Sequence, residues 1–422
     1  MLNLFKKYNI DKRIIDKLEV NRITVPTKIQ EDVIPAILNG KDAIAQSRTG
    51  SGKTLAYLIP LFDNVYKKKE KIIIIAPTNE LVKQIHQEAL RISDETITII
   101  SASGGENIST QISSIKKGFD VLIGVTGRII KLIESGALKA GIFKKMVLDE
   151  VDFMIDLGFY PDLQKIFGYA PNINQFMVFS ATMSQKTKGI LDLMHNQKYA
   201  YRPDAKNLIP ENISNFFIPI KEKEERLSVL IELTKIANPY LAIIFARTRD
   251  EVDWLYNKLK DNSIDVVKLS GALTPQQRKK ALVQFKDAKT QYLLSTDLAS
   301  RGLDVESVTH IINYNLPYNS IDFVHRAGRT GRMENKGIVI SICNPLDEGY
   351  LKKYAFELGF NPIPVKIENS RLVEDSNHKG VKPRFSLTEI QKNKRVNEAK
   401  QKPEKKSMEK KYAGKIRNKR KR

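Results

Sequence analysis

The residues best placed to do chemistry form a glycine-rich run early in the chain. Residues 47–54 read S-R-T-G-S-G-K-T, after a short apolar stretch and before an amphipathic one. Glycines let backbone N–H groups curl around phosphate oxygens, and the following helix adds the dipole of its N-terminus. Lys53 would then reach the β- and γ-phosphates of a nucleotide, and the Thr54 hydroxyl would ligate Mg²⁺. The strict form of this loop begins with glycine, where this chain has Ser47.

Carboxylates form the second candidate group. Asp149, Glu150 and Asp152 directly follow the apolar run 145–148. Asp149 could hold Mg²⁺, and Glu150 could orient and deprotonate an attacking water. An acidic triplet alone is more often a solvated turn, but beside a phosphate loop it predicts a nucleotide-hydrolysing site.

A third group lies in the other half of the chain, where residues 325–332 read H-R-A-G-R-T-G-R. Arginine pairs neutralise charge on a transferring phosphoryl group, which makes Arg329 and Arg332 candidate arginine fingers. The alternative is a set of surface arginines at a helix start. A site divided between two halves of a chain is complete only when those halves close.

These groups must be positioned by elements that alternate between apolar strands and amphipathic helices. We expect strands near 72–76, 121–125 and 175–179, and again near 241–245 and 337–342. Such alternation is typical of parallel α/β sheets. The sequence predicts two α/β domains, at 1–207 and 208–368, and a basic, disordered C-terminal tail at 369–422.

Composition narrows the class of protein. The chain has 422 residues, a net charge of +22 and one cysteine, which excludes an internal disulfide framework. No apolar run approaches the ~18 residues of a membrane span, so a cytoplasmic location without membrane contact is expected. Residues 391–422 carry 15 Lys and Arg against 3 Glu, which predicts an interaction tail or a merely solvated end.

In this setting the chain resembles the DEAD-box ATP-dependent RNA helicases of superfamily 2, especially bacterial cold-shock-type members. The resemblance runs from about residue 5 to residue 344. Residues 25–30 (V-P-T-K-I-Q) resemble the adenine-reading Q motif, and 149–152 (D-E-V-D) stand where the family has D-E-A-D. Residues 180–182 match S-A-T, and 325–332 match motif VI. The resemblance implies two RecA-like domains in tandem, with ATP and Mg²⁺ as cofactors.

The resemblance also implies roles for individual residues. Gln30 would hydrogen-bond the adenine edge, Phe5 would stack on its ring, and Asp304 would lie near the ribose. The expected ATP-binding residues are Phe5, Thr27, Gln30, Ser47, Arg48, Thr49, Gly50, Ser51, Gly52, Lys53, Thr54, Gly302 and Asp304. The expected catalytic residues are Lys53, Asp149, Glu150, Arg329 and Arg332, with Thr54 and Asp149 on the metal. Those expected to couple hydrolysis to strand separation are Asp152, Ser180, Thr182, His325 and Arg326.

The motifs implied to contact RNA depart further from the family pattern. The expected contacts are Pro77, Thr78, Gly104, Gly105, Thr126, Gly127, Arg128, Arg247, Thr248, Gly271, Arg278, Thr296 and Asp297. Asn79, Val125, Thr126 and Pro275 replace the usual residues of these motifs. Losing one charge-assisted phosphate contact costs ~1–3 kcal/mol, so these changes predict weaker RNA binding.

The expected activity is ATP-dependent, local unwinding of short RNA duplexes through sequence-independent backbone contacts. Ribosome assembly or mRNA turnover, in the cold, is the expected setting, with RNA-decay or ribosome-assembly proteins as partners. The tail would bind structured or ribosomal RNA. Two alternatives stay open: a DNA helicase or translocase on the same scaffold, and an RNA chaperone or clamp with weak unwinding. The oligomeric state is left undetermined.

Overall fold

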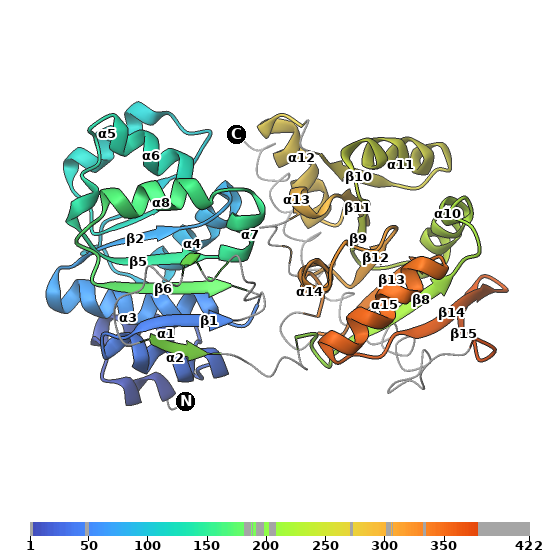
Figure 1. Cartoon of the computed structure of the whole chain (residues 1–422), viewed down its shortest axis with the longest axis horizontal. Coiled ribbons are helices and arrows are strands. Elements are labelled where there is room, and N and C mark those ends of the chain that lie inside the picture. Colours follow the sequence, from blue (N-terminus) through green and yellow to red (C-terminus); the bar gives the residue numbers. More distant parts are fainter. Residues whose placement is uncertain are drawn as a thin grey trace, which may run out of the picture.

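The chain folds into two α/β units, each built on a largely parallel sheet (Figure 1). The computed structural model describes residues 3–46, 50–180, 187, 189–190, 198–201, 208–270, 273–300, 305, 307–331 and 335–378. Residues 379–422 of the expected tail lie outside this set. Eight expected site residues do so as well: Ser47, Arg48, Thr49, Thr182, Gly271, Gly302, Asp304 and Arg332.

The first sheet has seven parallel strands in the order β3-β4-β2-β5-β6-β1-β7. The strands are β1 (Asp42–Gln46), β2 (Lys71–Ile75), β3 (Ile99–Ala102), β4 (Val121–Gly124), β5 (Phe143–Asp149), β6 (Gln175–Ser180) and β7 (Lys198–Tyr201). Around them lie η1 (Leu4–Tyr8), α1 (Lys12–Val20), α2 (Lys28–Leu38), α3 (Lys53–Lys68), α4 (Asn79–Ile92), α5 (Ile108–Lys117), α6 (Thr126–Glu134), η2 (Ala140–Ile142), α7 (Val151–Asp156) and α8 (Tyr160–Tyr169). Helices cover both faces, so a central strand such as β2 is an almost continuous apolar run.

The second sheet has eight strands in the order β10-β11-β9-β12-β13-β8-β14-β15. They are β8 (Ile213–Pro219), β9 (Ala242–Phe245), β10 (Val266–Leu269), β11 (Tyr292–Ser295), β12 (His310–Asn313), β13 (Gly337–Cys343), β14 (Ile363–Glu368) and β15 (Arg371–Glu374). The helices are α10 (Glu225–Ala237), α11 (Arg249–Asp261), α12 (Pro275–Lys286), α13 (Asp297–Ser300), α14 (Ser320–Ala327) and α15 (Pro345–Leu358). Only β15 pairs antiparallel, so the predicted fold class of two parallel-sheet domains is confirmed.

One expected boundary is wrong. The expected tail begins at residue 369, but β14 and β15 form a hairpin that continues to Glu374. Asn369 and Ser370 have φ angles of 49° and 56°, the left-handed pair that a tight two-residue hairpin turn requires. The second unit therefore extends past the predicted boundary.

Threonines start the helices that follow three of the strands. The hydroxyls of Thr78, Thr248 and Thr274 accept backbone N–H groups of α4, α11 and α12 at 3.2, 3.2 and 3.3 Å. Such caps satisfy one of the unpaired N–H groups of the first helical turn. Each cap fixes a helix N-terminus just beyond the carboxyl end of a strand, the edge where open α/β sheets bind ligands.

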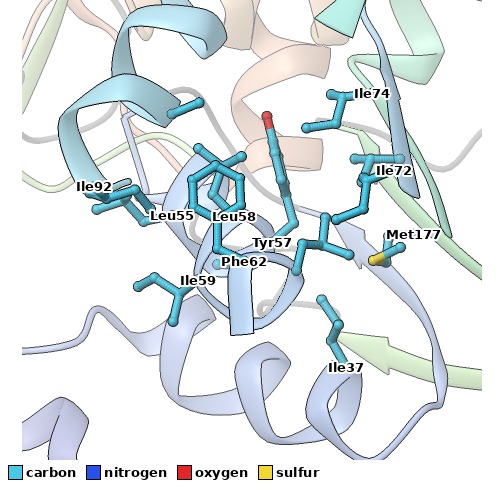
Figure 2. Close-up of a cluster of buried hydrophobic side chains, with 14 of the residues drawn as sticks. Ile37, Leu55, Tyr57, Leu58, Ile59, Phe62, Ile72, Ile74, Ile92 and Met177 are labelled. Atoms are coloured by element: carbon cyan, nitrogen blue, oxygen red, sulfur yellow. The ribbon is translucent and has the colours of Figure 1, made fainter. Parts of the chain in front are cut away.

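Helix α3 is buried along most of its length and organises the first core. Figure 2 shows Tyr57 beside Ile72, Ile74 and Met177, which come from the strands, while Phe62 lies farther along the same helix. The ring centroids of Tyr57 and Phe179 are 5.0 Å apart. Because α3 begins at Lys53, this packing also fixes where the glycine-rich loop ends. No helix within the described residues is both long and apolar enough to span a bilayer.

Replacing Phe62 tests how much this packing contributes to the stability of the protein. The ring is fully buried, so Phe62→Ala should remove about 3–5 kcal/mol of stability and lower the Tm by about 10 °C. Leu90→Ala, on the exposed side of α4, is the control and should leave the Tm nearly unchanged. Differential scanning calorimetry measures both variants. Equal shifts would contradict the assignment of α3 as the central core helix.

Candidate functional site

A buried cluster of charges lies where α3 begins and β5 ends. The Lys53 ammonium is 3.1 Å from Asp149 Oδ1 and 3.6 Å from Glu150 Oε1. Asp149 has no exposed surface, and Lys53 is buried as well. The structure therefore brings together the residues that the sequence predicted to contact phosphate, Mg²⁺ and the attacking water.

The charges in this cluster shift one another's protonation. Burial alone would lower the pKa of Lys53, but the carboxylates of Asp149 and Glu150 outweigh it and raise that pKa. Burial raises the pKa of Asp149, and the Lys53 ammonium offsets only part of that effect. Lys53 is therefore a permanent cation, whereas the Asp149 carboxylate gains from any further positive charge.

Tyr57 is a member of this cluster that the sequence analysis missed. Its hydroxyl donates to Asp149 Oδ2 at 3.0 Å and is also hydrogen-bonded to Thr54. Burial raises the pKa of this phenol well above its usual value, so the group remains a donor. The sequence signal that could have identified Tyr57 was its spacing of four residues from Lys53. Residues i and i+4 lie on one face of a helix, so Tyr57 and Lys53 share a face of α3.

The oxygen atoms of the cluster fit a hard divalent cation. Among the described residues, Asp149 Oδ1 accepts no hydrogen bond of good geometry, although the Lys53 ammonium is 3.1 Å away. A buried carboxylate oxygen with an unused lone pair is costly unless a ligand meets it. Together with the Thr54 hydroxyl it forms the oxygen donor set that Mg²⁺ prefers.

Gln30 ties the Q motif to the phosphate loop. Its Oε1 accepts the Thr27 N–H at 2.9 Å, and its Nε2 donates to the Gly52 carbonyl at 2.9 Å. Gly52 has φ 88°, and a Cβ there would lie 2.6 Å from Gln30 Nε2, so only glycine fits. Gly50, with φ 79°, also needs a left-handed backbone. One N–H of the Gln30 amide would then serve an adenine edge while the other holds the loop.

Phe5 is placed differently from its expected role. Its ring has no exposed surface and meets Tyr8 edge-on, with centroids 6.3 Å apart. A fully buried ring presents no face to a nucleobase, so the structure gives the adenine-stacking role of Phe5 no support. Burial in the core beside α2 and α3 explains the aromatic residue at this position instead.

Glu150 and Asp152 occupy a strained turn that leads from the nucleotide site to the second unit. Glu150 has φ 56°, an uncommon left-handed conformation for a residue other than glycine, and such strain clusters at functional sites. The Asp152 N–H donates to Ser180 Oγ at 3.2 Å. Asp152 Oδ2 also lies 3.7 Å from Nε2 of His325 on α14. Three of the expected coupling residues are thus joined.

Arg326 holds the carboxyl edge of the second sheet together. It binds both carboxylate oxygens of Asp297, at 2.5 and 2.7 Å, and donates to Asn313 Oδ1 and the Asn315 carbonyl. Its guanidinium lies 4.7 Å from the centroid of the Phe245 ring. Both oxygens of Asp297 are engaged by Arg326, which gives that side chain a positioning role, and the expected RNA contact at Asp297 remains a prediction. Arg329 is buried just beyond α14.

Two polar side chains shape the loops expected to grip RNA in the first unit. Asn79 Oδ1 accepts the Gly104 N–H at 2.5 Å, so Asn79 joins the start of α4 to the glycine pair. Arg128 donates to the Glu106 carbonyl and to Gln111 Oε1. Gly105 has φ 86°, which fits its place in this tight loop. Asn79 therefore lacks the positive charge of the residue usual at this position, but its side chain stabilises the loop at Gly104.

Burial separates the remaining expected RNA contacts into two groups. The side chains of Pro77, Thr126 and Thr296 are buried, and Thr296 Oγ1 accepts the Ala299 N–H at 3.3 Å. At these three positions the backbone groups are better placed than the side chains to reach a strand of RNA, and the expected contacts remain predictions. Gly127, Arg247 and Thr248 are exposed.

Arg278 joins the two units. Its Nε donates to Glu80 Oε1 on α4 at 2.9 Å, and its Nη2 donates to the Ala299 carbonyl at 2.9 Å. The sequence predicted Arg278 as an RNA contact, but this geometry makes it a bridge between α4 and α12. The bridge and the Asp152–His325 contact lie where α12, α13 and α14 face the first unit (Figure 1).

Comparisons with known proteins agree with this geometry. The family model DEAD/DEAH box helicase matches residues 27–190, and the model Helicase conserved C-terminal domain matches residues 222–334. The chain is 38% identical to the DEAD-box ATP-dependent RNA helicase CshB of Bacillus subtilis, over 82% of this chain and 80% of that one. It is 36% identical to the ATP-dependent RNA helicase CshA of Listeria monocytogenes, over 82% and 67%.

Solved structures share the fold. S. cerevisiae Dbp5 bound to RNA and ADP BeF3 has a TM-score of 0.77 at 24% identity, covering 86% of this chain and 96% of Dbp5. Mss116p bound to ssRNA and AMP-PNP has a TM-score of 0.74 at 23% identity, covering 86% and 79%. The two family models and the curated relatives assign both halves of the chain to the same kind of helicase. The chain belongs to the DEAD-box family of ATP-dependent RNA helicases.

Proposed function

We propose that this protein is an RNA-stimulated ATPase that separates short RNA duplexes by closing its two domains on ATP and single-stranded RNA in the cytoplasm. One observation carries the proposal. Lys53 contacts Asp149 and Glu150, which lie within three residues of Asp152 in the chain, and the Asp152 carboxylate lies 3.7 Å from His325 of the other domain. A change at the nucleotide is thereby linked directly to the domain interface.

The nucleotide end of the mechanism follows from the charges. Lys53 stays protonated and is free to exchange its carboxylate partners for phosphate oxygens. The glycines of the loop, held by Gln30, would present N–H groups to the same phosphates. Asp149 and Thr54 would hold Mg²⁺, which neutralises charge on the phosphates when bound. When a phosphate takes Lys53, Glu150 loses its cation and becomes a better base for water.

Domain closure would also build the RNA site. Several groups suited to binding phosphate lie at the carboxyl edges of the two sheets. They are the capped N-termini of α4 and α11, the Gly104–Gly105 loop and the exposed Arg247. Helix N-termini and arginines bind phosphates without reading bases. RNA held across both edges would be gripped only while Arg278 and Glu80 keep the domains together.

The biological setting extends this proposal. The relatives are named as ATP-dependent RNA helicases, CshA and CshB. For this chain we propose a use in ribosome assembly or mRNA turnover at low temperature, with RNA-decay or ribosome-assembly proteins as partners. Crosslinking of the protein to RNA in cells, followed by sequencing, would identify the target. Enrichment of mature tRNA alone would argue against both settings.

Glu150→Gln tests the role of the base. Removing the carboxylate should lower kcat for ATP by about 10²- to 10⁴-fold while ATP still binds, because Lys53 and Asp149 remain. Steady-state ATPase kinetics and equilibrium binding of a fluorescent nucleotide measure the two effects. Exposed Glu95→Gln is the matched control. Retained turnover and unwinding in Glu150→Gln would favour a different mechanism, and retained RNA function without turnover would favour an RNA clamp.

Arg278 and Glu80 should act as a pair in a double-mutant cycle. Either Arg278→Ala or Glu80→Gln should raise the RNA concentration for half-maximal ATPase about 5- to 20-fold, because the interdomain bridge is lost. The double variant should be no worse than the worse single variant. Lys260→Ala, which breaks a surface ion pair with Asp265, is the control. Strict additivity would show that Arg278 acts on RNA without Glu80.

Deleting residues 393–422 tests the basic tail. The deletion removes a segment rich in Lys and Arg, so the RNA concentration for half-maximal ATPase should rise by about tenfold at moderate salt. The log of this concentration should also depend less steeply on log salt, since fewer counterions are released. ATPase titrations at three salt concentrations measure both. An unchanged titration would assign RNA affinity wholly to the two domains.

A further inference from the structure

An exposed aromatic ring beside an exposed arginine lies at the carboxyl edge of the second sheet. Tyr318 follows β12 and is 74% exposed, which is unusual for so large an aromatic side chain. The Arg247 guanidinium, at the end of the neighbouring strand β9, lies 4.7 Å from the centroid of the Tyr318 ring. The pair therefore comes from two adjacent strand ends and is not a feature of one mobile loop.

Arg247 is itself fixed. Its Nη2 donates to the Leu316 carbonyl at 3.4 Å, and its backbone N–H donates to Asn315 Oδ1 and Glu251 Oε2. Asn315 in turn donates to Glu251 and supplies the carbonyl that Arg326 binds. The guanidinium lies over one face of the Tyr318 ring, while the ring stays largely open to solvent.

A ring held in this way is a ready platform for a flat ligand. Bases of single-stranded nucleic acid stack on aromatic side chains whatever their sequence, and arginine adds a cation–π contribution. Because Arg247 already fixes the ring, little side-chain freedom would be lost on binding. The adjacent α11 N-terminus, capped by Thr248, offers backbone N–H groups for a neighbouring phosphate.

We propose that Tyr318 is a base-stacking residue for an unpaired RNA nucleotide, in addition to the backbone contacts of the two domains. The proposal rests on the RNA-binding function argued above and deepens it. It assigns the second domain a contact that depends on the presence of a base but not on its identity. An unpaired base caught on the ring would be withdrawn from its complementary strand.

The test compares a 10-nucleotide single-stranded RNA with a strand of the same length whose riboses carry no bases. Fluorescence anisotropy gives Kd for both in the presence of a non-hydrolysable ATP analogue. Stacking of one base on an aromatic is worth about 5- to 140-fold in Kd. Tyr318→Ala should weaken binding of the base-bearing strand by that factor and leave binding of the abasic strand unchanged. Tyr318→Phe should keep the wild-type preference.

Tyr240 supplies the matched control. It is 43% exposed and lies just before β9, at the opposite edge of the same sheet, so Tyr240→Ala should keep the wild-type preference. An unchanged preference in Tyr318→Ala would overturn the proposal, and the ring would then serve another partner. Equal weakening of both strands would also overturn it, since the ring would merely support Arg247. Failure of the proposed function would look different, because RNA would not stimulate the wild-type ATPase at all.

Discussion

The structure depends on one unfavourable event, the burial of three charges at the junction of α3 and β5. Burial removes hydration from Lys53 and Asp149; the carboxylates outweigh this effect for Lys53, whereas the Lys53 ammonium offsets only part of it for Asp149. The core around Tyr57 and Phe62 must therefore be well packed to keep the cluster in place. Asp149 Oδ1, whose one close neighbour of opposite charge among the described residues is the Lys53 ammonium, retains the capacity to bind a further cation.

A few consecutive residues of the chain connect this cluster to the interface between the two domains. Glu150 is adjacent to Asp149, which contacts Lys53, and Asp152 lies two residues further on, where it meets both Ser180 and His325. The strained left-handed turn at Glu150 makes this arrangement possible, because it redirects the chain directly after β5. No long network of side chains is needed between the nucleotide site and the domain interface.

The parts that could be predicted from sequence are those fixed by local geometry. A glycine-rich loop between a strand and a helix can adopt few conformations, so the meeting of Lys53 with Asp149 and Glu150 was foreseeable. The tertiary contacts of individual side chains could not be predicted in this way. Phe5 lies in the core, Asp297 is engaged by Arg326, and Arg278 spans to Glu80, and each outcome depends on which distant side chain is nearest. The predicted boundary at residue 368 separated β15 from β14, because the pairing of these two strands is a tertiary contact that composition does not reveal.

The web around Arg326 has a mechanical consequence. One buried guanidinium links α13, which follows β11, to β12 and α14, and it lies over Phe245 at the end of β9, so the segments at the carboxyl ends of three adjacent strands are connected. Asn315 extends the bracing to Arg247, and through it to Tyr318. Connected in this way, the residues at this edge would have to break several contacts to move independently, so the bracing favours their displacement as a unit when the contact at His325 changes.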